Sequence, residues 1–220
     1  MTRLLNDKVD WIVPKVRGKK VLDLGCVRHS LEETKKTGWL HSLIVNEARE
    51  VLGVDYLQSE IESLSQSGYN VICANVETME LPDRYEVIVA GDLIEHLSNF
   101  GLFIAQVSKH MTENGVFLVT TPNPINFLRF MQMLVSGNLG ANNEHTCWFT
   151  EKTLLQLAER YGLKKTEVTY INDSSQYYLK AKWRPFVFIN DLVCSFRHQF
   201  AETLCVEFVK KQNLDLPQTN

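Results

Sequence analysis

Two histidines and one glutamate are the side chains of this chain best suited to move a proton. His96 follows Glu95 directly, and His145 stands alone later in the chain. Imidazole changes charge near neutral pH, so both histidines are candidate general bases. Glu95 could orient one of the rings by accepting a hydrogen bond. We therefore expect catalytic roles for His96, His145 and Glu95. The alternative is that the Glu-His pair only serves the N-terminus of a helix.

A second group of polar residues follows apolar runs and suits ligand binding. Asp23 and Gly25 lie near the end of the run 21–26, and Asp55 lies near the end of the run 51–56. Open α/β sheets bind ligands outside the carboxyl ends of their strands. There Gly25 would let the backbone approach a ligand, and Asp23 could accept hydrogen bonds from an ammonium group. An acid after the second strand can bind both hydroxyls of a ribose, so we expect this of Asp55, the alternative being a turn former.

Asn75 and Val76 follow a third apolar run. The amide of Asn75 and the backbone N–H of Val76 could each pair with the edge of a nucleotide base. Such contacts would complete a nucleotide site at the same edge of the sheet.

Alternating strand and helix patterns position these residues. Right-handed β-α-β units and a mainly parallel sheet follow from the alternation. We expect strands at 21–26, 51–56, 69–76, 85–90, 116–121, 165–171 and 202–210. We expect helices at 4–13 (ended by Pro14), 39–50, 57–68, 98–111 (capped by Ser98), 125–135, 150–161 (capped by Thr150) and 182–200.

Composition and charge are those of a globular protein. The chain has 220 residues, is 45% hydrophobic and carries a formal charge of -3, which disfavours a nucleic-acid partner. Five dispersed cysteines without a C-x-x-C pair indicate reduced thiols in a cytoplasmic protein. No run of 18 apolar residues suggests a transmembrane segment, so we expect a soluble single domain over residues 1–220. The oligomeric state is not predicted.

Two segments have a composition that suits inserts over a substrate cleft. Residues 125–147 are apolar at first and then rich in Gly and Asn, and residues 183–200 mix aromatic residues with charges. They suit a moderately apolar small molecule or a lipid-linked glycan, and peripheral contact with a membrane surface. The alternative is that these aromatic residues are ordinary core.

The ordered motifs resemble those of class I S-adenosylmethionine-dependent methyltransferases. The resemblance covers about residues 18–170, and it is closest to ubiquinone-type O-methyltransferases and those of glycan and natural-product pathways. It implies a Rossmann-like three-layer α/β/α sandwich whose seven-stranded, mainly parallel sheet has an antiparallel last strand. The motifs are VLDLGC at 21–26, GVD at 53–55, ANVE at 74–77, IEHL at 94–97, LVTTPN at 118–123 and EHTCWFT at 144–150.

The resemblance also assigns roles in binding S-adenosylmethionine. Asp23 and Gly25 would hold its methionine part, Asp55 its ribose hydroxyls, and Asn75 with Val76 its adenine. Tyr56, next to Asp55, is also expected to bind the cofactor. Asp92 would lie beside the sulfonium and the methyl group. The family pattern has glycines where this chain has Val27 and His29, so the turn after Gly25 must take another shape.

A metal site is a further implication of the resemblance. Asp92, Glu95, His96 and His145 resemble the set that binds a divalent cation in small-RNA terminal 2′-O-methyltransferases and partly that of ubiquinone O-methyltransferases. Oxygen and imidazole ligands suit magnesium or manganese. The first residue here is Asp rather than Glu, which shortens its reach.

We thus expect methyl transfer to oxygen, or less readily to nitrogen, of a small molecule or sugar. An NAD(P)-dependent oxidoreductase would share the strand, glycine and acid pattern but needs the G-x-G-x-x-G fingerprint, which is absent after Gly25. A non-catalytic binding protein with a degenerate glycine loop is the third alternative, supported by Val27 and His29.

Overall fold

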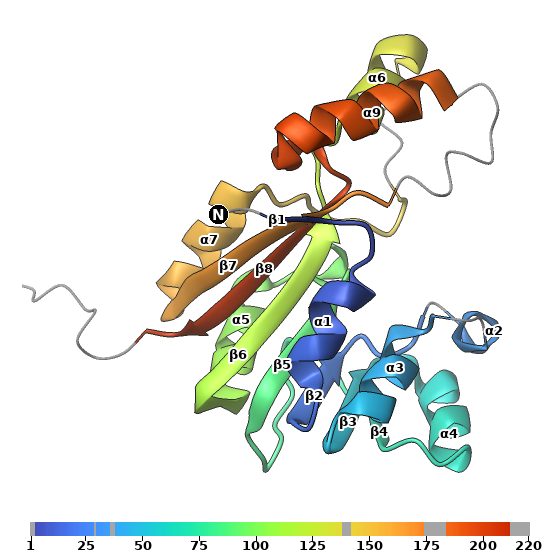
Figure 1. Ribbon diagram of the computed structural model, residues 1–220. Coiled ribbons are helices and arrows are strands. Elements are labelled where there is room, and N and C mark those ends of the chain that lie inside the picture. The colour runs from blue at the N-terminus through green and yellow to red at the C-terminus, as the bar shows by residue number, and fades with distance from the viewer. Residues whose placement is uncertain (1–2, 29, 36–37, 138–141, 174–183, 212–220) are drawn as a thin grey trace, which may run out of the picture.

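Helices and strands alternate along most of the chain. The computed structural model describes residues 3–28, 30–35, 38–137, 142–173 and 184–211 (Figure 1). The strands are β1 (Arg3–Leu5), β2 (Lys20–Leu24), β3 (Glu50–Asp55), β4 (Val71–Cys73), β5 (Tyr85–Gly91), β6 (Met111–Pro122), β7 (Leu163–Ile171) and β8 (Thr203–Lys210). The helices are α1 (Val9–Val16), α2 (Leu31–Thr34), α3 (Leu40–Glu47), α4 (Gln58–Gln66), α5 (Phe100–His110), α6 (Phe127–Ser136), α7 (Glu151–Arg160) and α9 (Arg184–Phe196), with 3-10 turns η1 (Ile94–His96) and η3 (His198–Phe200).

All the strands belong to one mixed sheet with the order β1-β7-β8-β6-β5-β2-β3-β4. β8 runs antiparallel to both of its neighbours, β6 and β7, and the other neighbouring strands are parallel. The expected Rossmann-like sheet with an antiparallel last strand is therefore confirmed. Its strand number differs, because the sheet formed by the described residues has eight strands rather than seven.

The additional strand is β1, at the N-terminus. We expected a helix from Leu4, which was wrong: Arg3–Leu5 pairs in parallel with Thr169–Ile171 of β7. The open edge of β7 offers these residues ladder hydrogen bonds, and α1 begins only at Val9, whose N–H donates to Asp7 Oδ1. The expected stop at Pro14 was also wrong, because Pro14 lies inside α1.

The start of α5 differs from the expected cap at Ser98. The backbone N–H groups of Ser98 and Asn99 both donate to Glu77 Oε1 at 2.8 Å, and Asn99 is the residue that precedes α5. A carboxylate from a distant loop thus holds this helix start, which no local pattern reveals. The cap of α7 is as expected, since Thr150 accepts from the N–H of Thr153 within a capping box.

Two layers of helices enclose the sheet. α1, α3 and α4 cover one face, and α5 and α7 cover the other (Figure 1). The first face buries Trp11, Ile12 and Ile44 against β2, β5 and β6, and the second buries a larger cluster that includes Phe103 and Phe117. The central strands are therefore apolar on both faces, as parallel strands require.

Helices α6 and α9 pack against each other beyond the carboxyl ends of the strands (Figure 1). They fall in the segments where we expected inserts. The assignment of one domain with two inserts stays a prediction, and Trp183 lies outside the described residues. Large apolar side chains on both helices are exposed, among them Phe130, Leu134, Phe188 and Phe196. No helix in the described ranges is both long and apolar enough to span a membrane.

Candidate active site

Hydrogen bonds hold the start of the turn after β2, where Val27 replaces a glycine of the family pattern. Gly25 has a φ of +73°, which a glycine adopts without strain. The N–H of Val27 donates to Asp55 Oδ2 at 2.9 Å, and the indole N–H of Trp39 donates to the carbonyl of Cys26 at 2.8 Å. A carboxylate and an indole therefore hold the backbone at Cys26 and Val27, the second of which replaces a glycine of the family pattern.

Asp55 lies at the end of β3, beside that turn. Its carboxylate is buried and accepts the N–H of Val27 on one oxygen and that of Leu57, at 3.2 Å, on the other. Burial raises the pKa of Asp55, whereas these backbone donors oppose the shift. The next residue, Tyr56, is 74% exposed, so its ring is accessible to a ligand.

Asn75 and Val76 follow β4 on the same side of the sheet. Asn75 Oδ1 accepts the N–H of Glu77 at 2.9 Å, which fixes the turn, and Val76 is buried. The other replaced glycine position, His29, lies outside the described residues.

Asp23 is buried near the end of β2 and pairs with a residue that the sequence did not single out. His41 of α3 places Nδ1 at 2.8 Å from Asp23 Oδ2, and both side chains are almost completely buried. Two polar groups thus meet inside the layer between α3 and the sheet.

Asp92 follows β5 in a strained backbone conformation. Its φ is +52°, and among the described residues no other non-glycine residue has a positive φ. Its carboxylate pairs with the ammonium of Lys8 and accepts the hydroxyl of Thr120 at 2.8 Å. Burial opposes ionisation, but the charge of Lys8 holds the pKa of Asp92 below its usual value.

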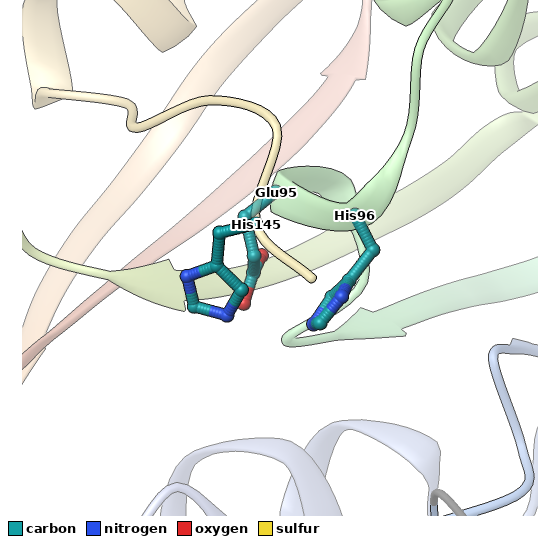
Figure 2. A group of neighbouring side chains, drawn as sticks. All are labelled: Glu95, His96 and His145. Carbon is teal, nitrogen blue, oxygen red and sulfur yellow. The ribbon is translucent and has the colours of Figure 1, made fainter. Parts of the chain in front are cut away.

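Glu95, His96 and His145 come together beyond the ends of β5 and β6 (Figure 2). One ligand atom of each lies within 4.8 Å of the others, and the two imidazole rings meet edge to face with centroids 4.7 Å apart. The backbone N–H of Thr146 donates to the carbonyl of Glu95 at 2.8 Å. This bond anchors the loop that brings His145 to the Glu-His pair.

The electrostatics favour the neutral forms of Glu95 and His145. Burial, and then the charge of Asp92, raises the pKa of Glu95 to about 8, although Thr121 donates to Glu95 Oε2 at 2.9 Å. Burial and then His96 lower the pKa of His145. Neither Glu95 Oε1 nor His145 Nδ1 has a hydrogen-bond partner among the described residues, although both atoms are buried. At neutral pH His145 can therefore accept a proton.

Further residues at this edge were missed by sequence reasoning. The guanidinium of Arg129 lies over the Trp148 ring at 4.8 Å, and burial raises the pKa of Glu202 to about 7. Lys8 and His41 were missed as well. In the sequence, each of these charged or imidazole side chains is a single polar residue within or beside a helical segment. Its partner becomes visible only in the tertiary structure.

Asp92 stands apart from the candidate metal ligands. The cluster found among the described residues contains Glu95, His96 and His145 but not Asp92, whose carboxylate is engaged by Lys8 and Thr120. The three remaining residues offer one carboxylate and two imidazoles, a donor set that suits a divalent cation.

The strand order, the glycine turn and the acids at the carboxyl ends of the strands define a Rossmann-like fold that binds a nucleotide cofactor. A family profile described as "Methyltransferase domain" matches residues 1–168. The chain belongs to this family, and the identification as a class I S-adenosylmethionine-dependent methyltransferase is confirmed. The oxidoreductase alternative is not favoured.

The names of two relatives indicate different acceptor atoms, oxygen for one and nitrogen for the other. A ubiquinone biosynthesis O-methyltransferase of Aeromonas salmonicida is 23% identical, over 71% of this chain and 68% of its own length. A (S)-coclaurine N-methyltransferase of Thalictrum flavum is 26% identical over 46% of this chain, which spans only 28% of that protein. The solved structure of a SAM-dependent methyltransferase from Archaeoglobus fulgidus aligns with a TM-score of 0.65 and 17% identity, covering 92% of this chain and 91% of its own. This last similarity concerns the fold.

Proposed function

We propose that the protein transfers the methyl group of S-adenosylmethionine to a hydroxyl oxygen of a small molecule or a sugar or glycan intermediate. The observation that carries the proposal is the Glu95, His96 and His145 cluster beside the cofactor edge of a methyltransferase-family fold. A hydroxyl acceptor needs a base, and two imidazoles stand there. Amine acceptors, which need less help, are the second candidate because an N-methyltransferase is among the relatives.

The cofactor would lie across the carboxyl ends of β2, β3 and β4. Asp23 and Gly25 are proposed to hold its methionine part and Asp55 with Tyr56 its ribose. Asn75 and Val76 would bind the adenine. Since Asp92 already pairs with Lys8, its role beside the sulfonium would be shared with that ammonium.

The reaction needs positioning and one proton transfer. The sulfonium is already activated, so the protein must hold acceptor oxygen, methyl carbon and sulfur in line and exclude water. His145 or His96 would take the hydroxyl proton as the O–C bond forms and the C–S bond breaks. The lowered pKa of His145 keeps this ring neutral and ready to act as the base.

Glu95, His96 and His145 are also proposed as ligands of magnesium or manganese. The buried Glu95 Oε1 and His145 Nδ1 fit such an ion, because neither has a partner among the described residues. A bound cation would lower the pKa of the acceptor hydroxyl. Asp92 was expected as a fourth ligand, and it would first have to leave Lys8.

The acceptor itself is proposed to be moderately apolar. Exposed apolar side chains lie on α6 and α9, and Arg129 of α6 stacks over the Trp148 ring. A nucleic-acid substrate is disfavoured by the net charge of -3. Peripheral membrane contact and a cytoplasmic location stay predictions.

A thermal-shift titration tests the cofactor. S-adenosylmethionine or S-adenosylhomocysteine at 100 times its dissociation constant should stabilise the protein by about 2.7 kcal/mol, or roughly 5–10 °C for a chain of this size. NAD should give no shift. Repeating the titration with magnesium, manganese and EDTA tests the cation. Absence of a shift with either adenosyl ligand would favour the non-catalytic alternative.

The base is tested by substitution once a screen of phenolic and sugar hydroxyl compounds yields an acceptor. His145→Ala should lower turnover about 100-fold or more, typical of a lost general base, and leave the affinity for S-adenosylhomocysteine nearly unchanged. His198→Ala is a control on a histidine outside the cluster. Equal activity in His145→Ala would remove His145 from the reaction.

A further inference from the structure

The contact between Asp23 and His41 joins two side chains that are among the most deeply buried polar groups of the protein. Asp23 is 3% exposed and His41 is 1% exposed, and Nδ1 lies 2.8 Å from Oδ2. Taking a carboxylate out of water is costly unless it is hydrogen-bonded, and an apolar pair of similar volume is often at least as stable. A contribution to stability is therefore a poor explanation for the pair.

Neighbouring residues leave room for this contact and hold its geometry. Asp23 pairs with Gly53 in the register of β2 and β3. A Cβ at Gly53 would lie 2.6 Å from His41 Cε1 and 2.9 Å from Cys26 Sγ, so only glycine admits the imidazole beside Asp23. A glycine within a buried strand weakens that strand, and here it makes space for the ring.

Aromatic rings fix the orientation of the imidazole. The Trp39 and Tyr69 ring centroids lie 5.3 Å and 5.7 Å from that of His41. Trp39 also holds the carbonyl of Cys26, in the turn that follows Gly25. The wall that packs against His41 is thus the one that shapes the glycine turn, which connects the pair to the cofactor edge.

His41 Nε2 has no hydrogen-bond partner among the described residues, although it is buried. When a neutral imidazole carries its proton on Nδ1, its Nε2 is a hydrogen-bond acceptor. A buried acceptor without a donor is tolerated more readily than a buried N–H without an acceptor. The arrangement therefore fits an imidazole that donates through Nδ1 to Asp23.

We propose that His41 is a positioning residue for the cofactor: it holds Oδ2 of Asp23, so that Oδ1 of the same carboxylate is aimed at the ammonium of the methionine moiety. This inference rests on the proposed cofactor role of Asp23. It adds that His41 acts only through Asp23 and only on the amino-acid end of the ligand.

Two ligands that differ at that end provide the test. S-adenosylhomocysteine carries the amino-acid part, and 5′-methylthioadenosine keeps the adenosine and the thioether without it. In calorimetric titrations His41→Phe should bind S-adenosylhomocysteine about tenfold or more weakly than the unsubstituted protein, as expected for a misplaced charge-assisted hydrogen bond. Its affinity for 5′-methylthioadenosine should stay within about twofold of that of the unsubstituted protein. Equal weakening of both ligands would mean a merely structural role and would overturn the proposal.

Two further variants keep the test decisive. His41→Asn retains an amide N–H close to the place of Nδ1 and should restore most of the affinity, including where His41→Phe folds poorly. In an Asp23→Asn background, His41→Phe should add less than about twofold to the loss, because residues that act through one contact are not additive. Additive losses, or no rescue by asparagine, would contradict the proposal.

His110→Phe is the matched control. His110 is another buried histidine, and its ring contacts the backbone of Leu81 and Gln106 rather than the cofactor edge. The His110→Phe protein should be less stable than the unsubstituted protein. The ratio of its affinities for S-adenosylhomocysteine and 5′-methylthioadenosine should be unchanged. If the unsubstituted protein binds neither ligand, the proposed function fails and this inference with it. Binding with an unchanged ratio in His41→Phe overturns only the inference.

Discussion

Acidic side chains at the carboxyl edge of the sheet differ in what holds them. Asp23 is held by an imidazole, Asp55 by backbone N–H groups and Asp92 by an ammonium. These partners determine the direction in which each carboxylate can still accept a hydrogen bond. In the proposed cofactor site, these partners would therefore set how strongly each carboxylate binds the ligand.

Asp55→Ala is expected to weaken the binding of S-adenosylhomocysteine by about 1–3 kcal/mol. The substitution removes the proposed ribose contact and also frees the N–H of Val27, which shapes the glycine turn. Calorimetric titration measures the change. Asp83→Ala, an exposed carboxylate that pairs with Lys20, is the control and should bind normally. Unchanged affinity in Asp55→Ala would refute the ribose role.

Strand β3 and helix α3 approach each other closely beside the proposed cofactor site. Because Gly53 has no side chain, the His41 ring can pack directly against β3. The turn after β2 then contacts Trp39, whose indole N–H donates to the carbonyl of Cys26. The helix and the strand therefore depend on each other, and neither positions the turn alone.

Gly53→Ala should destabilise the protein by about 1–3 kcal/mol through overpacking, because the added methyl group would meet His41, Cys26 and Val71. Urea unfolding monitored by circular dichroism gives the free energy of unfolding. In a His41→Ala background the same substitution should cost less, since the ring no longer occupies the space. An equal cost in both backgrounds would show that the ring is not the limiting contact.

For the whole molecule, the buried acids make stability depend on pH. The pKa of Glu95 is about 8 in the folded protein and near 4.5 in the unfolded chain, so the unfolded chain releases the proton first as pH rises. The stabilisation is complete below about pH 4.5 and is lost as pH rises towards 8. Glu202, with a pKa of about 7, acts in the same direction.

Glu95→Gln should therefore flatten the loss of stability between pH 5 and pH 8. A single such carboxyl contributes at most about 1.4 kcal/mol per pH unit. Urea unfolding at several pH values measures the slope, with Glu113→Gln, an exposed carboxyl, as the control. Identical slopes in the unsubstituted protein and Glu95→Gln would mean that Glu95 is ionised in the folded state.

Local patterns in the sequence predict the alternation of strands and helices, the glycine turn after Asp23, the acid at the end of β3 and the adjacency of Glu95 and His96. Each depends on a few neighbouring residues, through periodicity or turn chemistry. Tertiary structure alone decided that Arg3–Leu5 becomes a strand on β7, that Lys8 reaches Asp92, and that His41 enters beside Gly53 to hold Asp23. These contacts join residues far apart in the chain. Their free energy comes from burial and register, which local sequence does not encode.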